Sequence, residues 1–333
     1  MRKRVIVCGF GFMGQNHAAN ILHSDTLELA AVVDSTPKSV LKPVTGNIAA
    51  GAFDWEKLSD TPFFASLSAA LAACPADAVL IAAPTDAHLP LALEAAVKGK
   101  HIFVEKPLCF VPEDAKPLKL ELAGKDLVFQ VGHCVRFAGA YKLLRTLCKE
   151  GKFGRLRHLK LYRFTGRPNW GAWRNLEVSL TSATGPLFDL CIHDIDYALS
   201  LAGEPDSVKA DPTRESDCTF RTVWKYRNDG CSIEIEGGFM MPSPVPFRCG
   251  FTAVFDHAAA EYDSRLGEKV VISRDDGGES VDCMMENSVY MDEIAEFAAA
   301  MIDGKAVSCG FDDGIRAVTY CHKIKKLLES VRP

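Results

Sequence analysis

The chain has 333 residues, 48% of them hydrophobic, so it can bury a large core and is long enough for two domains. Its formal net charge of −5 provides no basic field for a polyphosphate backbone, which argues against a nucleic acid partner. No apolar run approaches the roughly 20 residues of a membrane-spanning helix, so we expect no membrane partner.

The 12 cysteines are scattered and include no Cys-x-x-Cys pair. This pattern is typical of a reducing compartment, so we expect a cytoplasmic location without a disulfide framework or a zinc site. The basic start of the chain superficially resembles a signal peptide, but Gly9, Gly11 and Gly14 interrupt its apolar region. We therefore interpret residues 4–8 as a first strand.

The first part of the chain alternates predicted strands and helices. This alternation predicts a parallel sheet with helices on both faces, and we assign residues 1–131 to a Rossmann-type domain. The segment 35–61 has little periodicity and is treated mostly as a connection. Strands are expected at 4–8, 27–33, 78–82, 102–104 and 127–131, and helices at 13–22, 67–73, 88–98 and 112–123.

After residue 132 the pattern changes to strand-length runs separated by turn residues. Strands joined by short turns predict an antiparallel sheet, so we assign residues 132–333 to an α+β domain. Strands are expected at 156–164, 218–226, 231–236, 249–255 and 270–273, and helices at 138–150, 185–201, 289–302 and 315–331. The fold class is therefore α/β, with a second domain built on a mostly antiparallel sheet.

A glycine-rich turn lies between the first strand and the first helix. Its glycines allow a tight turn and a close approach to a pyrophosphate, which the helix N-terminus favours. Asp34 ends the second strand 20 residues after Gly14, where it can bind the adenosine ribose and repel a 2′-phosphate. NAD is therefore favoured, although Ser35 and Lys38 keep NADP open. The predicted cofactor residues here are Gly9, Gly11, Phe12, Met13, Gly14 and Asp34.

Two further strand ends carry polar residues. Small residues around Pro84 and Thr85 would let the backbone approach the cofactor, whereas Asp86 and His88 could equally serve as helix cap and first-turn residue. The tripeptide 105–107 follows a buried strand, and a lysine there points into the crevice where open α/β sheets bind ligands. We add Pro84, Thr85, His88, Glu105 and Lys106 to the predicted cofactor residues.

A second polar cluster falls on the helix expected at 185–201. Asp189 and His193 are four residues apart, so we expect them to share one helix face and contact the same ligand. His193 would exchange the proton of an alcohol, Lys106 would stabilise the developing alkoxide, and Asp189 would hold a substrate hydroxyl. Asp189 and His193 alone lack the ligands for a metal site. We assign Asp194 and Asp196 to the helix N-terminus rather than to the site.

These motifs together resemble the Gfo/Idh/MocA family of NAD(P)-dependent oxidoreductases over nearly the whole chain. The resemblance implies a Rossmann domain, a second domain whose large open sheet serves oligomer contacts, and hydride transfer to or from sugars and cyclitols. It also implies that Lys106 is catalytic and that its bond to Pro107 is cis. The residues that carry the resemblance are 9–14, Thr85 with His88, 99–108, 131–133 with Arg136 and Phe137, and 189–196.

The sequence indicates the substrate less clearly than the cofactor. The polar and aromatic loop 167–175 suits a sugar but could be an ordinary surface loop. The run 131–137 resembles nucleotide-sugar 3-dehydrogenases of the family, and the run 189–196 is shared by those enzymes and by inositol 2-dehydrogenase-like members. Residues 182–185 depart from the two or three glycines that many relatives have before the catalytic helix. Predicted substrate-binding residues are His133, Arg136, Trp173, Asp189 and His193.

Three functions follow from these observations. The leading one is an NAD-dependent dehydrogenase acting on a secondary hydroxyl of a cyclitol or sugar, inositol 2-dehydrogenase-like, and working as a homodimer or homotetramer. A nucleotide-sugar 3-dehydrogenase would need a diphosphate site, for which Arg136, Arg167 and Arg174 are candidates. A non-catalytic NAD-binding regulator would have no need for Lys106, Asp189 and His193.

Overall fold

The computed structural model describes residues 2–38, 56, 58, 60–166, 185–214, 218–228, 230–242 and 245–330. It divides the chain into two compact units. Unit 1 comprises Met1–Cys134 and Asn287–Ile315, and unit 2 comprises Val135–Glu286 and Arg316–Pro333. This division differs from the single boundary expected after residue 131, because the chain returns to unit 1 near its C-terminal end.

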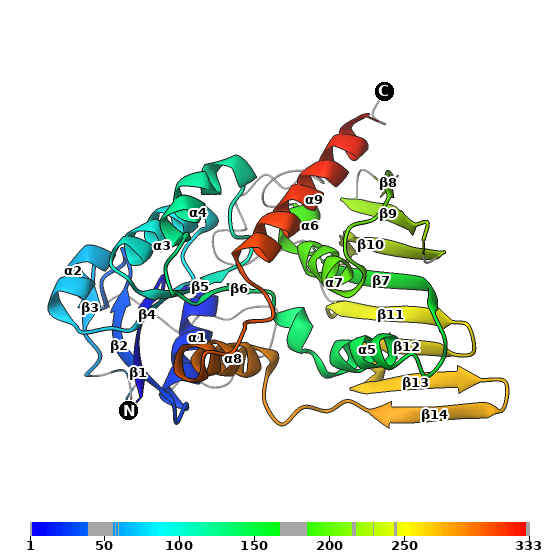
Figure 1. Ribbon diagram of the computed structural model, residues 1–333, viewed down its shortest axis with the longest axis horizontal. Coiled ribbons are helices and arrows are strands. Elements are labelled where there is room, and N and C mark those ends of the chain that lie inside the picture. Colours follow the sequence, from blue (N-terminus) through cyan, green and yellow to red (C-terminus); the bar gives the residue numbers. More distant parts are fainter. Residues whose placement is uncertain are drawn as a thin grey trace. The chain divides into compact units, whose positions relative to one another are not determined.

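Unit 1 is built on a six-stranded parallel sheet with the strand order β3-β2-β1-β4-β5-β6 (Figure 1). This is the order of a dinucleotide-binding Rossmann sheet, so the predicted fold class is confirmed. The central strands are almost wholly buried and rich in β-branched residues, as a sheet covered on both faces requires. The strands are β1 (Lys3–Cys8), β2 (Leu27–Val33), β3 (Phe63–Phe64), β4 (Ala78–Ile81), β5 (His101–Glu105) and β6 (Phe129–Gly132).

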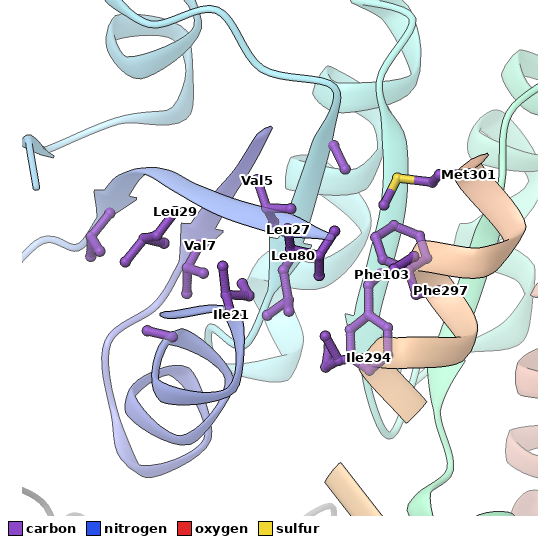
Figure 2. Close-up of a cluster of buried hydrophobic side chains, with 14 of the residues drawn as sticks. Val5, Val7, Ile21, Leu27, Leu29, Leu80, Phe103, Ile294, Phe297 and Met301 are labelled. Atoms are coloured by element: carbon purple, nitrogen blue, oxygen red, sulfur yellow. The ribbon is translucent and has the colours of Figure 1, made fainter. Parts of the chain in front are cut away.

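The helices of unit 1 follow the predicted alternation, with one addition from the distant α8. Figure 2 shows Ile294, Phe297 and Met301 of α8 packed with residues of the sheet and of α1. Each such side chain stabilises the unit by about 1.5–3 kcal/mol when fully buried. The helices are α1 (Phe12–Leu22), α2 (Leu67–Ala73), η2 (Thr85–Ala87), α3 (His88–Val97), η3 (Pro112–Ala115), α4 (Lys116–Leu122) and α8 (Val289–Asp303).

Unit 2 contains an eight-stranded sheet with the order β14-β13-β12-β11-β7-β10-β9-β8. Every neighbouring pair is antiparallel except β7 with β10, so the mostly antiparallel sheet is confirmed. The strands are β7 (Leu156–Gly166), β8 (Ser207–Arg214), β9 (Thr219–Tyr226), β10 (Cys231–Met241), β11 (Arg248–Phe255), β12 (Ala259–Asp263), β13 (Lys269–Arg274) and β14 (Gly277–Asp282). The sequence patterns did not predict β8, β12 or β14.

The two faces of this sheet differ in polarity. Leu159, Leu161 and Trp224 are buried on one face, whereas Lys160 on the other forms ion pairs with Glu234 at 3.1 Å and Glu236 at 2.8 Å. Such alternation is typical of an antiparallel sheet with one packed face. The remaining elements are η4 (Cys134–Phe137), α5 (Gly139–Glu150), α6 (Pro186–Asp189), α7 (Ile192–Ala202), η7 (Ser264–Leu266) and α9 (Phe311–Ser330).

The single helix expected at 185–201 is wrong, because the structure has α6 and α7 separated by a turn. The amide of Cys191 donates to the carbonyl of Pro186 five residues back, at 2.7 Å, which widens the chain beyond α-helical geometry. Gly237 of β10 lies so close that an added Cβ would overlap Cys191 Sγ. The described helices include none that is long and apolar enough to cross a membrane.

Candidate active site

The glycine turn after β1 has the geometry that a bound pyrophosphate requires. Gly9 has a φ of +85°, and a Cβ at Gly14 would overlap the Gly9 carbonyl oxygen, so both positions need glycine. A Cβ at Gly11, by contrast, would meet no atom within 4 Å. Gly11 caps α1 without a side-chain hydrogen bond, so the first-turn amides stay available for an anion. These residues fit a dinucleotide.

Asp34 follows β2 beside this turn. Its Oδ2 accepts the Phe10 amide at 2.6 Å and its Oδ1 accepts the Thr36 amide at 2.7 Å. Each carboxylate oxygen has a second lone pair, so ribose hydroxyls can still donate to it. Lys38, which kept NADP open, donates to the Leu58 carbonyl at 3.0 Å. The carboxylate of Asp34, fixed by two backbone amides, and Lys38, already bonded to a carbonyl, both favour NAD over NADP.

His88 connects the loops after β4 and β5. Its Nε2 lies 2.9 Å from the Ala83 carbonyl oxygen, and its Nδ1 lies 2.9 Å from that of Pro107. Burial lowers the pKa of His88, against the opposing effect of these carbonyls. The ring therefore has a structural function, and the predicted cofactor contact stays untested. The alternative with Asp86 as helix cap is wrong, since Ala87 precedes α3 and provides no side-chain cap.

Glu105 and Lys106 end β5 at the same edge of the sheet. The bond between Lys106 and Pro107 is cis, as the resemblance implied. Lys106 is half-buried, whereas Glu105 is buried and accepts the Lys106 amide on Oε2 at 3.2 Å. Glu105 Oε1 lies 2.7 Å from His17 Nε2. The carboxylate of Glu105 is thus used within the protein, and its predicted cofactor contact stays untested.

His17 was missed by the sequence analysis. It lies on α1 three residues after Gly14, and its ring is fully buried against Phe103, at a centroid distance of 5.2 Å. A polar residue on the buried face of the helix after the glycine turn was the available signal. Among the other predicted residues of unit 1, Thr85 is half-buried in η2 and His133 is buried just after β6.

Asp189 and His193 lie on either side of the turn between α6 and α7. Every residue from 185 to 199 is buried except these two, which are half-buried. A segment this buried that keeps only a carboxylate and an imidazole partly accessible is suited to hold a polar ligand. The two residues lie on two short helices rather than on one, and their predicted roles in substrate binding and catalysis stay untested.

Buried ion pairs fix α7, and the sequence analysis did not predict them. Asp194 accepts a hydrogen bond from Arg163 Nε at 2.8 Å, and Asp196 accepts one from Arg136 Nε at 2.7 Å. Each carboxylate is bonded by two guanidinium nitrogens. Burial alone would lower the pKa of Arg163, but the charge of Asp194 raises it well above its usual value. Arg136 thus has a structural function, and substrate binding by its side chain stays a prediction. The assignment of Asp194 and Asp196 to helix-end stabilisation missed these partners.

Some predicted substrate residues lie outside the described residues. They are Trp173 and, as diphosphate candidates, Arg167 and Arg174 of the same loop. Residues 182–184, which depart from the glycines of many relatives, also lie outside the described residues.

Two family models match the chain. The model described as "Oxidoreductase family, NAD-binding Rossmann fold" matches residues 3–133, and the "GFO/IDH/MocA C-terminal domain" model matches residues 141–253. The matched ranges contain the glycine turn, Asp34, Lys106, Asp189 and His193. The cofactor class predicted from the sequence is confirmed.

Three relatives illustrate the range of similar proteins. The chain is 24% identical to the uncharacterized oxidoreductase YrbE of Bacillus subtilis, over 95% of this chain and 92% of that protein. It is 30% identical to scyllo-inositol 2-dehydrogenase (NAD(+)) of Bacillus subtilis, over 60% of this chain and 54% of that protein. It is 29% identical to UDP-N-acetylglucosamine 3-dehydrogenase of Acidithiobacillus ferrooxidans, over 73% of this chain and 69% of that protein. The solved structure of that enzyme, GnnA, has a TM-score of 0.80 at 24% identity, covers 99% of both chains, and supports the fold.

Proposed function

We propose, from the premise that this chain belongs to the Gfo/Idh/MocA family of NAD-dependent oxidoreductases, that it transfers a hydride between NAD and a secondary hydroxyl of a cyclitol or sugar. The observation that carries the proposal is the half-buried Lys106, which leaves β5 at the same sheet edge as the glycine turn and Asp34. NAD supplies the hydride acceptor when bound. A cation at that edge is suited to hold the oxygen of the carbon that loses the hydride.

The proton of the substrate hydroxyl needs an acceptor. In the proposed oxidation the hydroxyl proton leaves as the hydride departs from the same carbon, and a carbonyl forms. His193 accepts the proton, because imidazole is the usual general base near neutral pH. Lys106 hydrogen-bonds the same oxygen and stabilises its developing negative charge, while Asp189 orients a neighbouring hydroxyl. In the reverse direction His193 returns the proton.

A free cyclitol or monosaccharide is the substrate class that we favour. The relative that oxidises scyllo-inositol with NAD supports this choice, and so does the half-buried Asp189, since carboxylates bind sugar hydroxyls. A nucleotide sugar would need a diphosphate site. Arg136, one of its three candidates, is already bonded to Asp196 through two nitrogens. The relative that acts on UDP-N-acetylglucosamine keeps this second substrate class as the alternative.

We further propose that the protein is a homodimer or homotetramer in the cytoplasm. The open face of the unit 2 sheet carries exposed Val254 and Val271 among ion pairs such as Arg248 with Asp263, a mixture suited to pairing with a second copy. All 12 cysteines lie in the described ranges, and none forms a disulfide there, which agrees with a reducing compartment. Light scattering of the purified protein tests the oligomer, and a monomer would contradict it.

A substrate panel tests the proposed function. The protein is mixed with NAD or NADP and with inositols, aldoses and UDP-sugars, and nicotinamide absorbance is followed. We expect turnover with NAD and at least one free cyclitol or sugar. Turnover of UDP-sugars alone would move the protein to the alternative class. Tight NAD binding without turnover of any compound would contradict the enzyme and favour a regulator.

A further inference from the structure

Three buried ionisable side chains meet at the carboxyl end of β5 in unit 1. His17 comes from α1, Glu105 ends β5, and Glu293 comes from α8. Their ring nitrogen and carboxylate oxygens lie within 4.8 Å of one another, and the exposed fractions of the residues are 0%, 7% and 0%. The reaction proposed above assigns a role to none of them, yet Glu105 directly precedes Lys106.

Glu105 is the charged member of this cluster. Burial alone would raise its pKa, but the hydrogen bond and charge of His17, together with the charge of Lys106, lower it overall. The carboxylate also accepts the Lys106 amide, so it holds the backbone from which the lysine side chain starts. His17 thus keeps a negative charge beside Lys106 in a place where an isolated carboxylate would be costly.

Glu293 is the neutral member. Both of its carboxyl oxygens are buried without a hydrogen-bond partner among the described residues. Its backbone carbonyl accepts Gln130 Nε2 at 3.0 Å, which fixes this part of α8 against β6. Burial, reinforced by the charges of Glu105 and Glu296, raises its pKa well above the usual value. Two carboxylates this close cannot both ionise cheaply, so the proton stays on Glu293.

Other titratable groups face Glu105 as well. On α3, His88 interacts electrostatically with the charge of Glu105. On α8, the Tyr290 hydroxyl interacts electrostatically with both Glu105 and Glu293. β6 contributes the uncharged Gly132, which pairs with Glu105. Burial raises the pKa of Tyr290 and lowers that of His88, so neither favours its charged form. Glu105 is therefore the anion of the cluster.

We infer that His17 and Glu293 are positioning residues for Lys106, acting through Glu105, on the basis of the catalytic role proposed above for that lysine. His17 binds one oxygen of Glu105 and holds it ionised. Glu293 stays neutral and leaves Glu105 as the single negative charge beside Lys106. The cluster thereby sets both the orientation and the proton affinity of the lysine that holds the substrate oxygen.

A shared metal ion does not account for this geometry. His17 Nε2 and Glu105 Oε1 are 2.7 Å apart, which is hydrogen-bond length. Two ligands at about 2.0–2.1 Å from a tetrahedral zinc ion stand roughly 3.3 Å apart. The contact is that of two groups that share a proton.

Lysine NMR and kinetics of the full-length protein test the inference. Lys106 is observed in ¹³C-lysine-labelled protein and assigned by its loss in Lys106→Met. In His17→Leu we expect Lys106 to titrate at lower pH. We expect kcat to fall about 10- to 100-fold, since a misplaced catalytic group loses such factors. Substrate KM and NAD affinity should stay within about threefold of the parent values. His17→Gln, which keeps an N–H donor, should recover most of both losses.

Glu293 has a separate prediction. Glu293→Leu, which removes the polar carboxyl, should lower kcat about tenfold, and Glu293→Gln, a neutral isostere, should restore most of it. The Gln variant should also keep its activity as pH rises, because ionisation of Glu293 lowers the activity of the parent. His23→Leu, an exposed histidine of the same helical region, is the matched control and should change neither readout.

The outcomes separate this inference from the proposed function. The positioning role would be overturned if Lys106 titration and kcat in His17→Leu equal those of His23→Leu. It would also be overturned if Glu293→Gln leaves the dependence of kcat on pH unchanged. Should His17→Leu fail to fold, His17→Asn, too short to reach Glu105, replaces it. A shifted Lys106 titration in a protein that turns over no polyol would leave the positioning role standing and remove the proposed function.

Discussion

The two units hold their polar residues in different ways. In unit 1 the glycine turn, Asp34 and Lys106 each follow a strand of one parallel sheet, so backbone geometry alone brings them to one edge. In unit 2, Asp189 ends α6 and His193 lies on α7, and α7 is fixed by ion pairs with two arginines that are 31 and 60 residues away in the chain. Unit 1 thus depends on chain conformation, and unit 2 on long-range side-chain contacts.

The largest effect on stability is expected where an ion pair of unit 2 is broken. Arg163→Met leaves Asp194 buried without its guanidinium partner, which should cost about 3–5 kcal/mol in the free energy of unfolding. Urea unfolding monitored by circular dichroism measures this loss.

The matched control is Arg157→Met, whose pair with Asp256 is largely exposed and should cost less than about 1 kcal/mol. Equal losses for the two variants would mean that buried ion pairs do not hold unit 2 together.

Two glycines of unit 1 should separate fold from cofactor binding. Gly14→Ala places a methyl group on the Gly9 carbonyl and should cost roughly 1–3 kcal/mol of stability. Gly11→Ala meets no protein atom, so stability should persist while NAD affinity, measured by calorimetry, falls about tenfold because the methyl obstructs the pyrophosphate. Unchanged NAD affinity in Gly11→Ala would place the dinucleotide elsewhere.

In unit 1, the carboxylate after β2 is expected to set the choice between NAD and NADP. Replacing Asp34 by Ala removes the carboxylate that repels a 2′-phosphate, so the ratio of NAD to NADP affinity should fall about tenfold. Parallel titrations with both dinucleotides measure it. A ratio that does not change would assign cofactor choice to other residues.

A separate effect concerns pH. The pKa of Glu293 is raised in the folded state, so its contribution to stability is complete below the unfolded value near 4.5 and is lost as pH rises through the folded value. Glu293→Gln removes this loss, so the variant should gain stability relative to the parent as pH increases from 5 to 9. Urea unfolding across this range measures the difference, and parallel curves would show that Glu293 is ionised.

The contrast between the units also explains what the sequence could predict. Local patterns placed nearly all strands of the Rossmann sheet, and the order of strand ends located Asp34 and Lys106. They missed His17, because its partner Glu105 is 88 residues away in the chain. They also missed the break before α7, because it depends on Gly237 of a distant strand. Strands such as β14, exposed along most of its length, carry no hydrophobic alternation that a pattern could detect.

The most direct test of the central claim is the turnover of Lys106→Met with the best substrate of the panel. We expect a loss of about 10²- to 10⁴-fold in kcat with NAD affinity preserved, because the variant removes the cation that holds the substrate oxygen. Lys98→Met, at an exposed lysine after α3, should match the parent. Parent-like turnover by Lys106→Met would contradict the catalytic role of Lys106.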